Sequence, residues 1–166
     1  LVVIEDALHL ARYEFQNAPN HVMRWTGSQW SILGGAVSCS YYDGQAAHPS
    51  IYDIIEYNGS IVACGEFDAV GGTPMAGIMR WNGTNWNGLG SGFTGDLPPF
   101  ANRYPHAMTI FQNDLIATGN FTHAGGILCN GIARWDGSMW AAMGEGFNAA
   151  VYGVSVHQGQ LYAVGA

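Results

Sequence analysis

The chain has 166 residues, of which 48% are hydrophobic and 10% charged, and its formal net charge is −7. Its five cations, all arginine, are too few for the basic surface that binding to nucleic acid or to an anionic membrane requires, so both partners are disfavoured. No apolar run is long enough to insert across a membrane, and 24 glycines with 13% aromatic residues favour short strands and tight turns.

The chain repeats one short phrase, Arg-Trp-x-Gly-x-x-Trp, beginning at residues 24, 80 and 134. A fixed period of this size predicts a repeat architecture. The first copy is the least regular. Its strands are predicted at residues 2–4 and 9–15, and residues 5–8 stand where the later copies have better turn sequences.

The second copy is the clearest. Two β-rich runs, 51–57 and 60–67, flank Asn58-Gly59, which is the strongest short hairpin signal. A loop over 68–76 follows, and then a second hairpin with strands at 77–81 and 86–90. Four strands in about 54 residues match one blade of a β-propeller.

The third copy follows directly, with strands at 107–111, 115–121, 132–135 and 140–143, and a further hairpin is predicted at 151–157 and 160–165. The sequence therefore predicts an all-β propeller of four-stranded antiparallel blades in one repeat domain, 1–166. Its repeats span 1–50, 51–105 and 106–150, with a half-repeat at 151–166. Since rings of four to eight blades are typical, about three and a half blades predict an excerpt of a longer propeller, or a partial ring completed by an oligomer.

Two phrases of the third copy carry a family resemblance. They are Gly-Asn-Phe-Thr-His-Ala-Gly-Gly at 119–126 and Asn-Gly-Ile-Ala-Arg-Trp-Asp-Gly-Ser-Met-Trp at 130–140. They resemble the kelch-like repeat of galactose-oxidase-type propellers. They are still more similar to the variant found in large secreted bacterial surface proteins and in the fungal cortical cell-polarity marker. The resemblance implies an extracellular or cell-surface location. The chain departs from kelch repeats at Arg12-Tyr13, Cys64-Gly65 and Thr118-Gly119, where Gly-Gly is usual, and nothing matches the copper ligands of galactose oxidase.

Each repeat carries a tryptophan pair that a four-residue turn places on one sheet face. Sugar stacking is one interpretation, but recurrence in every copy favours packing between blades. The arginine before each pair is predicted to make an ion pair, with a carboxylate such as Glu66 or Glu145, or a cation–π contact, and these roles are favoured over a substrate anion site. These structural repeat residues are Trp25, Trp30, Trp81, Trp86, Trp135, Trp140, Arg24, Arg80 and Arg134.

The long connections of a four-stranded meander share one rim of the sheets, and binding residues concentrate on loops held by a rigid scaffold. Aromatic rings mixed with carboxylates and an arginine on this loop face would suit a polar ligand such as a glycan. The ligand-binding candidates are Tyr41, Tyr42, Asp43, His48, Asp68, Asp96, Arg103, Tyr104 and His123.

No spacing of cysteines or histidines typical of a metal centre occurs, so no cofactor or metal is predicted, although calcium held by loop carboxylates stays open. No catalytic motif is recognised either. The sequence favours a non-catalytic extracellular binding or adhesion module with a protein or glycan ligand, which also associates with itself or with missing blades. Two alternatives stay open: a propeller-fold carbohydrate-active enzyme or oxidase with a site on the loop face, and a structural spacer.

Overall fold

The computed structural model describes residues 2–4, 7–12, 20–39, 49–95 and 103–166. Within these ranges the chain is all-β, and all of its strand pairs are antiparallel. No described helix is long and apolar enough to cross a membrane.

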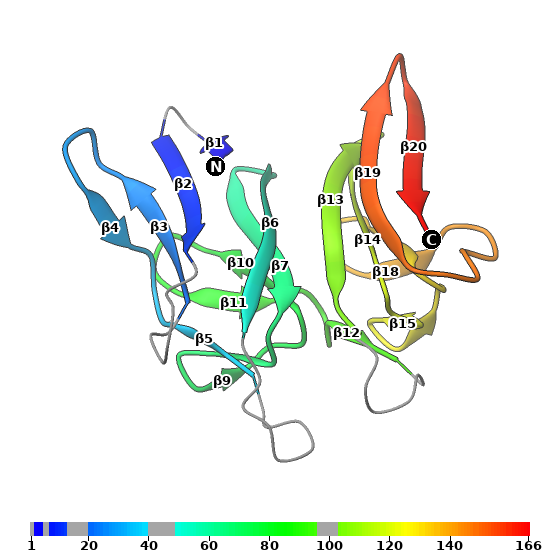
Figure 1. Cartoon of the computed structure of the whole chain (residues 1–166), viewed down its shortest axis with the longest axis horizontal. Helices are drawn as coiled ribbons and strands as arrows, with labels where there is room; N and C mark the ends of the chain where they lie inside the picture. The colour runs from blue at the N-terminus through cyan, green and yellow to red at the C-terminus, as the bar shows by residue number, and fades with distance from the viewer. Residues whose placement is uncertain (1, 5–6, 13–19, 40–48, 96–102) are drawn as a thin grey trace.

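Three sheets of four strands follow one another across the molecule in chain order, and a two-stranded hairpin follows them (Figure 1). In each sheet the strands pair in sequence order, as in a meander. The first sheet contains β1 (Val2–Ile4), β2 (Ala7–Arg12), β3 (His21–Trp25) and β4 (Trp30–Ile32). The second contains β6 (Ser50–Tyr57), β7 (Ser60–Glu66), β10 (Ile78–Trp81) and β11 (Trp86–Gly88). The third contains β13 (Pro105–Phe111), β14 (Asp114–Gly119), β17 (Ile132–Trp135) and β18 (Trp140–Ala142), and the hairpin is β19 (Val151–His157) with β20 (Gln160–Gly165).

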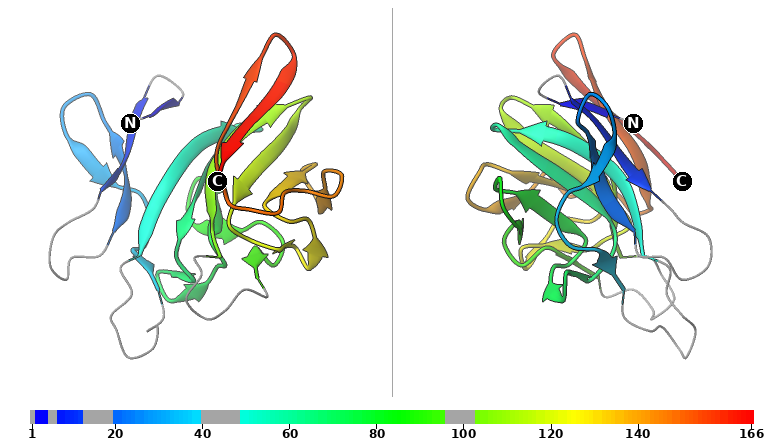
Figure 2. Two further views of the ribbon diagram at one scale, coloured as in Figure 1. Left: turned by 45° about the vertical axis from the view of Figure 1, so that its right-hand side comes forward. Right: turned by 90° about the vertical axis from the view of Figure 1, so that its left-hand side faces the viewer.

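Two small three-stranded sheets also occur: one links the first large sheet to the second, and the other links the second to the third (Figure 2). One contains β5 (Val37–Ser38), β8 (Ala69–Val70) and β9 (Thr73–Pro74); the other contains β12 (Phe93–Thr94), β15 (His123–Ala124) and β16 (Ile127–Leu128). The prediction of plain loops at 68–76 and in the matching part of the third repeat therefore needs correction. The two glycines at 71–72 and at 125–126 all have positive φ and close a tight turn in each segment. The strand that follows the preceding large sheet then pairs with the hairpin around this turn: β5 pairs with β8, and β12 pairs with β15.

The predicted strands agree closely with the observed ones except in the first repeat. There Ile4 pairs with Ala7, so β2 begins two residues before the predicted residue 9, and only residues 5 and 6 separate the paired strands. The rest of that predicted strand, residues 13–15, lies outside the described residues. The Asn58-Gly59 turn has positive φ at both residues, 48° and 67°, as a type I′ hairpin turn requires.

The tryptophan pairs lie on the second hairpin of each large sheet. The ring centroids are 5.6 Å apart in the first pair, 5.2 Å in the second and 5.3 Å in the third. The later tryptophan of a pair also reaches the preceding sheet: Trp86 donates its indole N–H to the Leu33 carbonyl at 2.7 Å, and Trp140 donates to the Leu89 carbonyl at 2.9 Å. Both side chains are buried, so the hairpins contribute to the core between sheets.

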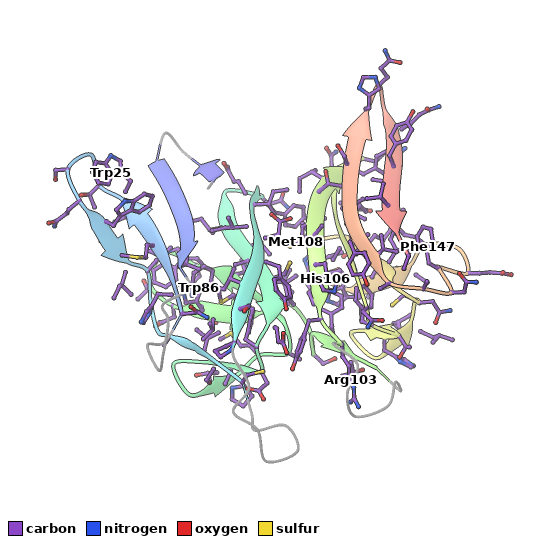
Figure 3. All side chains as sticks on the ribbon, in the orientation of Figure 1. Trp25, Trp86, Arg103, His106, Met108 and Phe147 are labelled. Carbon is purple, nitrogen blue, oxygen red and sulfur yellow. The ribbon has the colours of Figure 1, made fainter. Side chains whose placement is uncertain are left out.

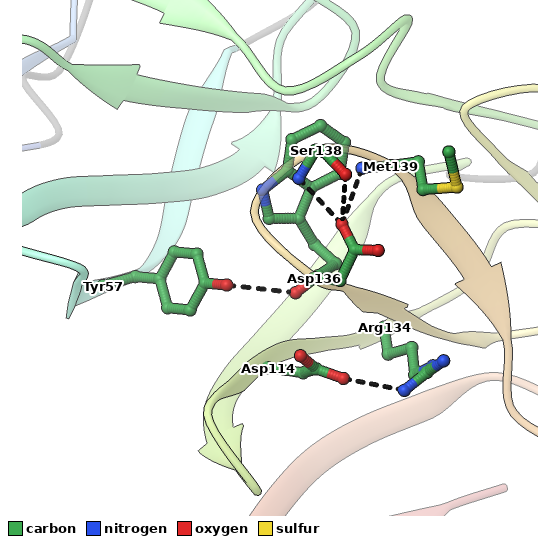
Figure 4. A network of polar contacts seen from close by, with 7 residues as sticks. Tyr57, Asp114, Arg134, Asp136, Ser138 and Met139 are labelled. Carbon is green, nitrogen blue, oxygen red and sulfur yellow. Dashed lines mark hydrogen bonds and ion pairs between the residues drawn. The ribbon is translucent and has the colours of Figure 1, made fainter.

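A set of polar contacts fixes the tryptophan hairpin of the third sheet (Figure 4). The Tyr57 hydroxyl of the second sheet donates to the Trp135 carbonyl at 3.3 Å, which joins the two sheets. Arg134 forms an ion pair with Asp114 on the neighbouring strand at 2.8 Å. The partner of Arg134 is therefore Asp114 and neither of the glutamates considered from the sequence. Because the Arg134 side chain is half-exposed, the ion pair adds little stability.

Asp136 closes the turn of this hairpin. Its Oδ1 accepts the Ser138 and Met139 backbone N–H groups and the Ser138 hydroxyl, which lowers the pKa of the carboxyl to about 2. In the second sheet the Asn82 side-chain oxygen accepts the equivalent backbone N–H groups, those of Thr84 and Asn85. An amide oxygen can therefore replace the carboxylate in this turn.

We expect Asp136→Asn to fold normally but to lose part of its acid sensitivity. Because the folded-state pKa is lowered, the carboxylate contributes stability above its ordinary pKa of 3.8, and this contribution is lost as the pH falls towards 2. Thermal unfolding midpoints measured across this range should fall less steeply in the variant than in the native protein. Asp136→Ala, which removes the acceptor, should lower the midpoint at neutral pH as well. Equal slopes for native protein and Asp136→Asn would contradict the assignment.

Candidate functional site

The first strands of the second and third sheets and of the last hairpin, β6, β13 and β19, share one irregularity. Each has a register shift at its second or third residue, where Tyr52, His106 and Tyr152 stand outside the regular pairing. Such bulges redirect the side chain of the extra residue. The glycine near the end of each neighbouring strand permits the shift. A Cβ added to Gly65, Gly119 or Gly165 would lie 2.1–2.3 Å from a backbone oxygen at the start of the bulged strand.

The three redirected rings form a continuous row across the strands. Tyr52 and His106 stack with centroids 5.1 Å apart and an interplanar angle of 24°, and His106 meets Tyr152 edge-on at 5.3 Å. Tyr52 is 40% exposed and Tyr152 57% exposed, so both ends of this aromatic row are open to solvent. His106 lies near the loop-face end of β13 (Figure 3).

Polar groups surround the Tyr52 end of the row. The Tyr52 hydroxyl donates to Glu66 Oε2 at 2.8 Å. Partial burial, then this bond and the charge of Glu66, raise the pKa of Tyr52. The Tyr104 hydroxyl lies 3.6 Å from the Cys39 sulfur, and burial followed by the Cys39 contact and the charges of Glu66 and Asp68 raises its pKa. Both phenols therefore stay protonated at neutral pH and can donate hydrogen bonds.

Burial lowers the pKa of His106, although the nearby Glu66 partly opposes this effect. The imidazole is therefore neutral at pH 7, with one nitrogen able to donate and the other able to accept. The Asp53 carboxylate, one residue after Tyr52, accepts the Ile54 and Met108 backbone N–H groups at 2.8 and 2.7 Å and so joins β6 to β13. Burial nevertheless raises the pKa of Asp53, because two backbone donors offset only part of its lost hydration.

The structure describes four of the nine candidates from the loop face. Tyr104 and Asp68 lie near one another and near Glu66, beside the aromatic row. Arg103 lies close to Gly95, at the loop-face side of the third sheet (Figure 3). His123 is in the small sheet with β12, where its Nδ1 lies 2.8 Å from the Thr122 hydroxyl oxygen. The other five, Tyr41, Tyr42, Asp43, His48 and Asp96, lie outside the described residues.

Sequence reasoning missed the aromatic row itself. Tyr52 and Tyr152 fall inside predicted strands, His106 falls just before the predicted strand 107–111, and Glu66 is considered only as an arginine partner. The available signal was positional: each ring is the second or third residue of the first strand of its repeat, and the neighbouring strand carries a glycine opposite the residue before the ring. A bulge reverses the side-chain alternation from which strand faces are predicted.

The described ranges contain no group of three or more His, Cys, Asp or Glu side chains that could hold a metal ion. The arrangement offers instead two exposed aromatic faces, phenol and imidazole hydrogen-bonding groups and a carboxylate. This combination can stack on an apolar ring face and bind the hydroxyl groups around it.

Comparison of the chain with protein-family models, curated proteins and solved structures finds no match. The kelch-like resemblance therefore stays a prediction, and the function has to be argued from the site.

Proposed function

We propose that the chain is a segment of a kelch-like β-propeller that acts as a non-catalytic binding module at the cell surface or outside the cell. Successive four-stranded meanders in chain order, each joined to the next by a small sheet, support the propeller architecture. The repeated phrases and their family resemblance support the location, and the net charge of −7 agrees with a partner that is not an anionic polymer.

The proposed ligand is a glycan, and the aromatic row carries this proposal. Sugars present apolar C–H faces and a rim of hydroxyl groups, so their sites combine aromatic faces with a few polar side chains. Tyr52 and Tyr152 supply exposed rings, while Glu66 and neutral His106 supply an acceptor and an acceptor–donor pair. His106 is in contact with both tyrosines, which fixes the spacing between the two rings.

We expect Tyr52→Ala and Tyr152→Ala each to weaken glycan binding by about tenfold, since the loss of one stacked ring costs about 0.5–1.5 kcal/mol beyond its buried area. A glycan array would identify the oligosaccharide, and calorimetric titration would give the dissociation constants. Tyr52→Phe should show a smaller loss, because it keeps the ring and removes only the hydroxyl that Glu66 holds.

Tyr162→Ala is the matched control, because Tyr162 lies on β20, outside the row, and its exposure is between those of Tyr52 and Tyr152. It should bind glycan like the native protein. The proposal fails if the array gives no ligand, or if Tyr162→Ala weakens binding as much as the row variants do.

A further inference from the structure

The later tryptophans of the second and third pairs, Trp86 and Trp140, occupy the same kind of site on the preceding sheet. The site consists of a backbone carbonyl, the glycine after it and an apolar side chain three residues beyond that glycine; we call it the indole seat. Leu33, Gly34 and Val37 form the seat for Trp86, which donates to the Leu33 carbonyl. A Cβ added to Gly34 would lie 2.5 Å from the Trp86 ring, so the indole lies directly on the glycine.

The second seat contains Leu89, Gly90 and Phe93, and Trp140 occupies it. The indole N–H donates to the Leu89 carbonyl at 2.9 Å, and the ring centroids of Phe93 and Trp140 are 4.8 Å apart. A Cβ added to Gly90 would lie 3.4 Å from the Trp140 ring. Both glycines have positive φ, 76° at Gly34 and 60° at Gly90.

A third seat with the same spacing is formed by Met143, Gly144 and Phe147, and it is open. Gly144 has the same backbone conformation, φ 64°, yet no described atom lies within 4 Å of a Cβ built on it. Phe147 is 46% exposed, whereas Phe93 at the matching position is 3% exposed and Val37 is 1% exposed. A pocket of about 400 Å³ adjoins Phe147, bounded by residues 119–122, 130–131 and 145–149.

The outer edge of β20 is open next to this seat. In the second and third sheets the matching strands, β7 and β14, pair on this side with β10 and β17. Their residues at the two matching positions, Val62 with Cys64 and Ile116 with Thr118, are all buried. On β20 the same positions hold Tyr162 and Val164, which are 49% and 67% exposed, and β20 pairs only with β19 among the described strands (Figure 1).

We propose that the third indole seat and the outer edge of β20 together form a docking site for a tryptophan-bearing β-hairpin of the repeat's own type. Its first strand, of the pattern Gly-Ile-x-Arg-Trp, pairs with β20 so that the isoleucine lies opposite Val164 and the arginine opposite Tyr162. Ile132 and Arg134 have this register on β14, opposite Thr118 and Ile116. The second tryptophan occupies the seat, where its indole N–H donates to the Met143 carbonyl.

The chemistry of the seat and of the strand edge identifies the occupant. The seat needs an indole, because the two filled seats each combine an accepting carbonyl with a flat surface at glycine. The strand edge needs an extended backbone with apolar residues on the covered face. A second folded copy of the chain does not offer such a hairpin, since β3–β4, β10–β11 and β17–β18 already belong to complete sheets. The occupant is therefore a hairpin from a further repeat. This docking site does not depend on the glycan proposal.

The test extends the chain with its own third-repeat sequence. Ala166 matches Asn120, since both backbone N–H groups bond to the carbonyl that precedes the bulged strand, so residues 121–143 are appended after Ala166. We expect the thermal unfolding midpoint to rise and amide exchange at Tyr162 and Val164 to slow. Trp140→Ala made only in the appended copy should remove most of this protection.

A synthetic peptide of residues 130–143 provides the second measurement. We expect saturable binding to the native chain, with Phe147→Asp weakening it at least about tenfold, as truncating an anchor contact does. Ile32→Asp changes another exposed apolar residue, on β4, and should bind the peptide like the native chain.

The proposal is overturned if neither extension nor peptide stabilises the chain, or if Phe147→Asp and Ile32→Asp bind the peptide equally. It is also overturned if sedimentation shows a dimer that protects Phe147 while the peptide fails to bind, because the occupant is then a second copy. Failure to bind glycan would contradict the proposal for the aromatic row and would leave the docking proposal unaffected.

Discussion

Trp140→Ala should lower the free energy of unfolding by about 3–5 kcal/mol, the cost of truncating a large buried aromatic side chain. Trp140 is 4% exposed, lies 4.8 Å from Phe93 and 5.3 Å from Trp135 between ring centroids, and donates to the Leu89 carbonyl. Its removal leaves a cavity between the second and third sheets and a buried carbonyl without its donor. Chemical denaturation of the two proteins measures the difference.

Trp30→Ala is the control that the repeat itself provides. Trp30 makes the same contact with its pair partner, at 5.6 Å from Trp25, but is only half-buried and makes no described bond to a preceding sheet. We expect it to cost less than half as much as Trp140→Ala. Equal losses would mean that the tryptophans stabilise their own hairpins and not the contact between sheets.

Gly119→Ala should destabilise the chain by about 1–3 kcal/mol, as overpacking does, and should also disturb the aromatic row. The added methyl group would lie 2.3 Å from the Tyr104 carbonyl oxygen and 2.7 Å from Pro105 Cα, and these backbone atoms cannot move as a flexible side chain could. Relief requires the bulge at the start of β13 to change, and this bulge directs His106 towards Tyr52 and Tyr152. Chemical denaturation measures the change in the free energy of unfolding. The NMR resonances of the His106 imidazole show whether the aromatic row is disturbed.

Gly88→Ala is a suitable control for this effect. Gly88 lies on β11, lacks a positive φ, and an added Cβ would have an ordinary contact at 3.5 Å. It should change neither the stability by more than about 0.5 kcal/mol nor the His106 resonances. If Gly119→Ala leaves His106 unchanged while destabilising the fold, the bulge does not control the row.

The hairpins could be predicted from sequence because they depend on neighbouring residues. The Asn58-Gly59 turn and its flanking alternation define β6 and β7, and the bounds predicted for β19 and β20 are confirmed. The two small sheets could not be predicted in the same way. Each joins the exit of one repeat to a hairpin in the next, so its pairing depends on how whole sheets lie side by side.

The candidate site was harder to predict, and for a different physical reason. The loop-face argument included Asp68 and Tyr104 among its candidates, and the structure brings both close to Glu66. The row of Tyr52, His106 and Tyr152 depends on three bulges, and a bulge shifts the two-residue period on which strand faces are assigned. The three residues also come from three strands that are far apart in the sequence, and a local sequence pattern does not show that these strands lie side by side.

The central claim is that ligand binds at the aromatic row and that the tryptophan hairpins serve packing. Its most direct test is an NMR titration of aromatic side-chain resonances with an oligosaccharide found on the array. We expect saturable shifts of the Tyr52, His106 and Tyr152 resonances and unchanged resonances of the half-buried Trp25 and Trp30. Shifts at the tryptophans with an unchanged row would contradict it.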